Sequence, residues 1–91
     1  MSEQSLLEAL KYRIVVDEHG TRRYYNKDNR LHRTNGPAVE YADGTKRWIQ
    51  NDQYHRIDGP AMEYPTGDNR WFINGKELTE TEFNQAVKQY E

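Results

Sequence analysis

The sequence predicts a mainly β fold: an antiparallel meander of about three hairpin units of 23 residues, with a short N-terminal helix and a C-terminal capping helix. A nine-residue pattern returns after 23 residues, turn sequences recur between strand-like segments, and both ends have helical periodicity. The 91 residues support a single domain. We divide it into an N-terminal helix (1–10), a β-repeat sheet (11–78) and a C-terminal helix (79–91).

The repeat is the strongest signal in the chain. Arg-Thr-Asn-Gly-Pro-Ala-Val-Glu-Tyr at 33–41 returns as Arg-Ile-Asp-Gly-Pro-Ala-Met-Glu-Tyr at 56–64, and a histidine precedes each copy. Side chains that recur at equivalent positions usually do one structural task in each unit. We therefore assign a structural role to the recurring positions His32, Gly36, Pro37, His55, Gly59 and Pro60.

Turn residues set the strand boundaries. Asn74-Gly75 predicts a two-residue hairpin, because a type I′ turn needs positive φ at both central residues, and Asn51-Asp52 is its weaker equivalent. Pro37 and Pro60 have no N–H to donate, so each should open a strand or lie on an edge. The expected strands are 11–17, 21–26, 30–33, 37–42, 45–50, 53–57, 60–64, 69–73 and 76–78.

Both ends of the chain are expected to be helical. Ser2 precedes an amphipathic run with leucines at 6, 7 and 10, and Thr79 with Glu82 forms a capping box. One face of the C-terminal helix is apolar, with Phe83, Ala86, Val87 and Tyr90. The helices are expected to cap the sheet, and a role as a binding arm stays open for the C-terminal one.

Composition excludes several classes of protein. The chain has no cysteine, which excludes a disulfide framework and a thiolate site and is typical of a reducing compartment. No apolar run approaches the length of a membrane span, and residues 1–10 carry acids instead of the basic start of a signal peptide. We expect a cytoplasmic protein that does not enter the membrane.

Charge is distributed unevenly along the chain. The net charge is −2, but residues 11–33 hold seven basic side chains against three acidic ones. Such a segment attracts phosphates or an acidic protein face. The alternative is an ordinary solvated surface, which we prefer because a nucleic-acid binder of this size usually has a basic overall balance.

The repeated unit resembles the MORN-like β-hairpin repeats. The likeness covers residues 20–78 and is closest to the His-Arg-x-Asp-Gly-Pro-Ala repeats of small phage and bacterial proteins. Trp48, Asn51, His55, Gly59 and Gly67 follow the MORN-like spacing approximately, with one additional residue between Trp48 and His55. The resemblance implies an interaction surface instead of a catalyst, and phage proteins of this size often disable a host machine.

Metal binding and catalysis are the competing interpretations of the histidines. A stable zinc site needs three or four ligands, and acid–base catalysis needs groups that converge on one pocket. His32 and His55 instead recur one unit apart, which favours a structural imidazole bonded to the Asn/Asp-Gly turn that follows each of them. We predict no enzyme activity, no metal and no cofactor.

The aromatic residues are the candidates for binding. Neighbours in a strand point to opposite faces, so Tyr24, Trp48 and Trp71 should share one face and Tyr25, Ile49 and Phe72 the other. One face forms the core; the other is covered by the helices, by a second copy or by a partner. Aromatic and arginine side chains are enriched in interface hot spots. The predicted partner-binding residues are Arg22, Tyr24, Arg33, Arg47, Trp48, Arg70 and Trp71.

These observations predict a non-catalytic protein–protein interaction module. Its concrete form is a small phage-type accessory protein that inhibits a host defence complex by surface binding, as an anti-CRISPR protein does, in the cytoplasm of a bacterial host cell. A homodimer is expected because a thin sheet with two partly apolar faces gains by pairing. The alternative is a nucleic-acid-binding or nucleotide-sequestering β-repeat protein.

Overall fold

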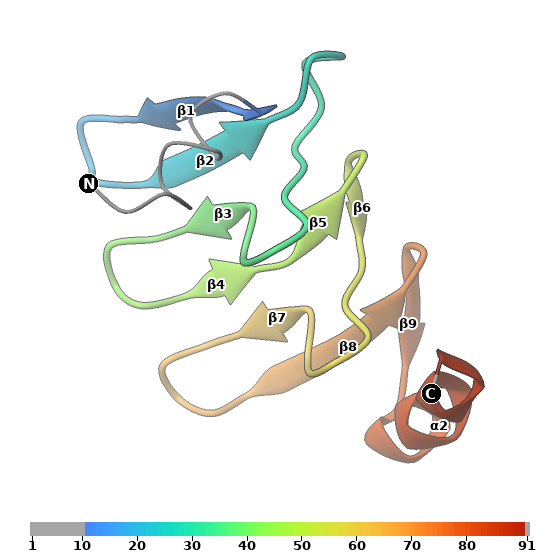
Figure 1. The fold of residues 1–91 in the computed structure, drawn as a ribbon. Coiled ribbons are helices and arrows are strands. Elements are labelled where there is room, and N and C mark those ends of the chain that lie inside the picture. The colour runs from blue at the N-terminus through green and yellow to red at the C-terminus, as the bar shows by residue number, and fades with distance from the viewer. Residues whose placement is uncertain (1–10, 91) are drawn as a thin grey trace.

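Seven strands form one antiparallel sheet, and two more form a separate hairpin (Figure 1). These elements come from a computed structural model, which describes residues 11–90. The sheet order is β1 (Arg13–Val16), β2 (Arg22–Tyr25), β3 (Val39–Glu40), β4 (Lys46–Arg47), β7 (Met62–Glu63), β8 (Asn69–Ile73) and β9 (Lys76–Leu78). The hairpin joins β5 (Ile49–Gln50) to β6 (Gln53–Tyr54). The structure thus confirms a mainly β, antiparallel fold; the expected helix at 1–10 lies outside the described residues.

The hairpin turns have the conformation that their sequences predict. Asn74 and Gly75 have φ of 51° and 83°, and Asn51 and Asp52 have φ of 49° and 66°. Positive φ at both central positions matches the right-handed twist of the flanking strands. These turns join β8 to β9 and β5 to β6 on the same side of the molecule (Figure 1).

Two of the predicted strands are wrong in detail, and both errors concern hydrogen-bond partners. The segment 30–33 is not a strand but an isolated bridge between Leu31 and Tyr25. The segment 45–50 is two strands, because the chain exchanges partners at Trp48. The residues before Trp48 pair with β3 and β7, whereas those after it pair with β6.

The core consists of two small clusters with the same residue arrangement. Ala38, Val39 and Ile49 form the first, and Ala61, Met62 and Phe72 form the second, 23 residues further along the chain. Tyr54 packs against both clusters and joins them. Ile49 and Phe72 are therefore core residues, whereas Tyr25, predicted on their face, is only partly buried and Tyr24, predicted on the other face, is buried.

The C-terminal helix begins at the predicted capping box. In α2 (Glu80–Ala86) the Glu82 amide donates to the Thr79 hydroxyl at 3.1 Å, and the Thr79 amide donates to the Glu82 carboxylate at 2.9 Å. A 3₁₀ turn, η1 (Val87–Tyr90), follows α2. The side chain of Phe83, which belongs to α2, is buried. Within residues 11–90 no helix is long and apolar enough to cross a membrane.

Removal of the cap is expected to loosen this helix. Thr79→Ala should lower the free energy of unfolding by about 1 kcal/mol, because it removes the hydroxyl that accepts from the Glu82 amide. Urea denaturation measures the change. Thr81→Ala, in an exposed position inside the same helix, is the control; equal losses in both variants would contradict a capping role.

Candidate functional site

A groove of about 600 Å³ lies between the two copies of the repeated segment, and we call it the central groove. One wall comes from the first copy and the other from the second. Its lining residues are Arg33, Thr34, Asn35, Gly36, Trp48, Gln50, His55, Arg56, Ile57 and Asp58. Aromatic, arginine and aliphatic side chains together are the composition of a protein interface core.

Several contacts hold Arg56 in place in the groove. Its guanidinium lies 3.7 Å from the centroid of the Trp48 ring and donates to the Pro60 carbonyl at 3.0 Å and the Glu63 carboxylate at 2.9 Å. Gly59 permits this position, because a Cβ there would lie 2.8 Å from Cζ of Arg56. The repeated glycine therefore leaves space for the repeated arginine.

The first copy builds the same arrangement on a tyrosine. The Arg33 guanidinium lies 4.1 Å from the Tyr24 ring centroid, donates to the Pro37 carbonyl at 3.2 Å and lies 3.6 Å from the Glu40 carboxylate. A Cβ at Gly36 would lie 2.9 Å from Cζ of Arg33. Each copy thus stacks its arginine on an aromatic ring and pairs it with its own glutamate.

The histidines bond to backbone, but not to the turn that was predicted. The Asn51 amide donates to Nδ1 of His32, and the Asn74 amide donates to Nδ1 of His55, each at 3.0 Å. The partner is the hairpin turn 19 residues later, instead of the Asn/Asp-Gly turn that follows each histidine. An imidazole that accepts at Nδ1 is neutral and carries its proton on Nε2.

Acidification should weaken the contact at His55. Burial lowers the pKa of His55 below its ordinary value of 6.5, and a protonated ring cannot accept from the Asn74 amide. The unfolded chain then binds more protons than the folded chain, so this part of the stability is complete above pH 6.5 and is lost as the pH falls below it. Urea titrations at pH 7.5 and 5.5 should show this loss.

The matched variant for this prediction is His55→Asn. The asparagine Oδ1 occupies nearly the place of Nδ1, accepts from the same amide and does not titrate. The variant should therefore lose less stability than the wild type between the two pH values. An identical loss in both proteins would show that the His55 contact does not contribute to the pH dependence.

The histidines do not converge on a common centre. His55 lines the central groove, whereas His32 lines a different groove with Lys11 and Tyr12. In the described part of the chain, no group of three or more His, Cys, Asp or Glu side chains is placed to hold a metal ion. Each of the two repeated histidines instead accepts a hydrogen bond from a hairpin-turn amide.

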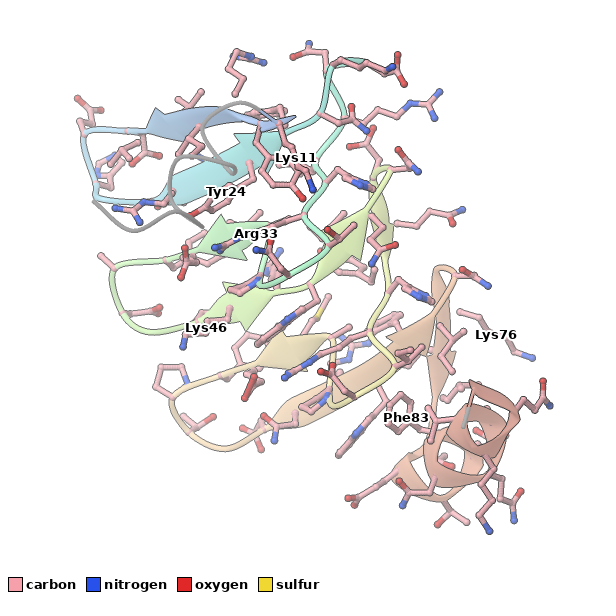
Figure 2. The ribbon with its side chains drawn as sticks, in the orientation of Figure 1. Lys11, Tyr24, Arg33, Lys46, Lys76 and Phe83 are labelled. Atoms are coloured by element: carbon pink, nitrogen blue, oxygen red, sulfur yellow. The ribbon has the colours of Figure 1, made fainter. Side chains whose placement is uncertain are left out.

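Part of the predicted binding set is not on the surface. Tyr24 is only 3% exposed, so it does not serve as a partner contact and is instead the ring below Arg33. Figure 2 labels both side chains. Arg33 and Trp48 line the central groove, and Arg22 is exposed on β2 away from its lining residues.

The other predicted binding residues lie outside the groove. The Arg47 guanidinium donates to the Tyr54 hydroxyl at 3.2 Å. Arg70 forms a two-pronged pair with Glu77 at 2.6 Å, which lowers the pKa of the Glu77 carboxyl. Trp71 is half-buried on β8. The predicted partner-binding residues are therefore divided, and of them only Arg33 and Trp48 share a groove.

Six groove-lining residues were not among the predicted site residues, and Arg56 and Ile57 are two of them. Arg56 was omitted although it is the 23-residue equivalent of Arg33, so the repeat itself contained the signal. Ile57 is 41% exposed in the groove and takes the position of Thr34 in the first copy. A difference between repeats at one position, polar in one and apolar in the next, is the sign that would have indicated it.

No protein-family model, curated protein or solved structure matches the chain. The central groove itself combines a stacked Trp48–Arg56 pair with the exposed aliphatic side chain of Ile57. The groove lining also includes the polar residues Thr34, Asn35, Gln50 and Asp58. In protein interfaces, apolar side chains pack closely and lose their water, while polar groups form hydrogen bonds around them.

Proposed function

We propose that the chain is a non-catalytic protein–protein interaction module whose partner docks in the central groove. The observation that carries the proposal is the exposed Ile57 side chain beside the Trp48–Arg56 stack. A partner side chain that covers Ile57 would bury apolar area against a pre-formed aromatic wall. Ordered anchors of this kind provide most of the binding energy in protein interfaces.

The recurring contacts support the absence of catalysis in this proposal. Arg56 is engaged by the Pro60 carbonyl and by Glu63, and Nδ1 of His55 is occupied by a backbone amide. These groups are tied into the fold, whereas a general base must be free to exchange a proton with a substrate. Binding of a partner, by contrast, requires only that the Arg56 and His55 side chains stay in place on the surface of the groove.

We further propose that the units are MORN-like repeats, about three in number, and that the partner is a host protein complex. The repeat motif at 33–41 and 56–64 supports the first part, through its resemblance to phage and bacterial repeat proteins. The same resemblance and the small size support an inhibitor of a bacterial defence complex, of the anti-CRISPR kind, in the host cytoplasm. Pairing of two copies remains part of the proposal.

The test is affinity purification of the tagged chain from a bacterial host, with nuclease treatment, at several salt concentrations. The wild type should recover a defined protein, and Ile57→Glu should lose it. Val16→Glu is the matched control, because Val16 is an aliphatic residue that is 55% exposed on β1, outside the groove. Plating of phage on a host with an active defence system tests the inhibitory role with the same variants.

Three outcomes would overturn the proposal. In the first, Ile57→Glu recovers the same protein as the wild type. In the second, Val16→Glu loses the partner while Ile57→Glu retains it, which would move the interface to the edge strand. In the third, no protein is recovered at any salt concentration.

A further inference from the structure

Besides the central groove, two adjoining grooves lie at the β1–β2 end of the molecule. Volumes of about 600 and 370 Å³ adjoin each other and share Lys11, Tyr12, Asn26 and Lys27. We call the two together the basic groove. Its remaining lining residues are Arg13, Asp28, Asn29, His32, Thr34 and Asn51. In Figure 2 Lys11 lies at this end, whereas Lys46 and Lys76 lie in other parts of the structure.

Among residues 11–90, the cations of the basic groove have no carboxylate partner of the kind found elsewhere in the sheet. Arg23, Arg33, Arg56 and Arg70 each lie within 4 Å of a carboxylate. Within residues 11–90, by contrast, no such ion pair is formed by the three cations of the basic groove, Lys11, Arg13 and Lys27. Among the described lining residues Asp28 is the single acid, so the described cations outnumber the acids.

One of these cations is held in place by neutral groups. Arg13 donates to Oδ1 of Asn29, and its guanidinium lies 4.4 Å from the centroid of the Tyr25 ring. Neither contact neutralises the charge. An arginine that is fixed but uncompensated is preorganised for an incoming anion, since little side-chain entropy is then lost on binding.

Neutral groups add directional contacts and a flat surface. Nδ1 of His32 accepts from the Asn51 amide, so its Nε2 carries a proton that can be donated. The Tyr12 ring lies 6.4 Å from the His32 ring, and its hydroxyl bonds to the Thr34 side chain at 3.1 Å. A fixed aromatic ring beside cations is the combination that binds a base and a phosphate together.

We propose that the basic groove binds a phosphorylated ligand of nucleotide size. Lys11, Arg13 and Lys27 would contact the phosphates, and Tyr12 would contact the base. The volumes are in the range of small-molecule sites. A long nucleic acid is disfavoured, because the whole chain has a net charge of −2 and a polyanion would extend beyond the local positive region.

The experiment is isothermal titration calorimetry of the full chain with ATP, with inorganic triphosphate and with a ten-nucleotide single-stranded DNA. The test variant is Lys11→Gln/Lys27→Gln. The control is Lys46→Gln/Lys76→Gln, which removes the same charge from exposed positions that do not line the basic groove. The wild type and the control should bind ATP equally, and the test variant should bind it at least tenfold more weakly.

Amide chemical shifts locate the site independently of affinity. Addition of ATP should move the resonances of residues 11–13 and 26–34 and leave those of α2 unchanged. Loss of binding in the control variant as well as the test variant would show non-specific attraction. Tighter binding of the DNA than of ATP would assign the groove to nucleic acid, and no saturable binding of ATP by the wild type would overturn the proposal.

Discussion

Phe72→Ala is expected to lower the free energy of unfolding by about 3–5 kcal/mol, the range measured for large aromatic truncations in protein cores. Phe72 is 7% exposed on β8, packs against Ala61 and Met62, and has its ring centroid 5.1 Å from that of Tyr54. A domain of this size has a total stability of roughly 5–14 kcal/mol. The substitution therefore removes a large part of the stability of the chain.

Urea denaturation followed by tryptophan fluorescence measures this change, since the two tryptophans lie at 48 and 71. Phe72→Leu should recover most of the loss, because it refills most of the volume. Ile14→Ala, at a residue 40% exposed on β1, should change the midpoint only slightly. A small effect at Phe72 together with a large one at Ile14 would place the core on the opposite face of the sheet.

Arg56→Ala is expected to cost about 2–3 kcal/mol, more than a surface arginine normally contributes. The Arg56 side chain is 19% exposed and joins the Trp48 ring, the Pro60 carbonyl and Glu63. Its removal leaves the carbonyl without its donor and uncovers the indole. Because a guanidinium can lie flat on an aromatic ring while it forms several hydrogen bonds, and an ammonium group cannot, Arg56→Lys should not restore the stability.

Arg70→Ala is the matched control for this prediction. Arg70 also pairs with a glutamate, Glu77, but both side chains are about half exposed (49% and 45%), so solvent screens the interaction. Its urea midpoint should stay close to that of the wild type. If Arg70→Ala and Arg56→Ala were equally destabilising, or if Arg56→Lys were as stable as the wild type, the stacked arginine would not be a structural element of the repeat.

The parts of the fold that depend on local chemistry could be predicted from the sequence. Asn74-Gly75 adopts the expected turn because few other residues tolerate positive φ there, and Thr79 caps α2 because its hydroxyl accepts from the Glu82 amide. The exchange of partners at Trp48 was not predictable. It depends on which distant strands hydrogen-bond to each half of 45–50, and alternation along one strand carries no such information.

The candidate site was predictable in composition but not in position. Aromatic and arginine side chains do line the groove. Strand alternation placed Tyr24 and Trp48 on the same face, however, and of these two only Trp48 lines the groove, whereas Tyr24 is buried. Tyr24 is buried because the Arg33 guanidinium lies over its ring and Tyr12 packs against it in a T-shaped arrangement, with 6.0 Å between the two ring centroids. Tyr12 precedes the repeat, so no comparison between units indicates this contact. Ile57 belongs to the site only because the fold places the two copies of the repeated segment next to each other.

Photo-crosslinking from single positions tests most directly whether a protein partner occupies the central groove. A benzophenone amino acid replaces Ile57 in the groove or Asn84 on the exposed side of α2. Irradiation in the bacterial host should give a covalent adduct with one protein from position 57 and none from position 84. Adducts from position 84 alone would identify the C-terminal helix as the binding arm and would contradict docking in the groove.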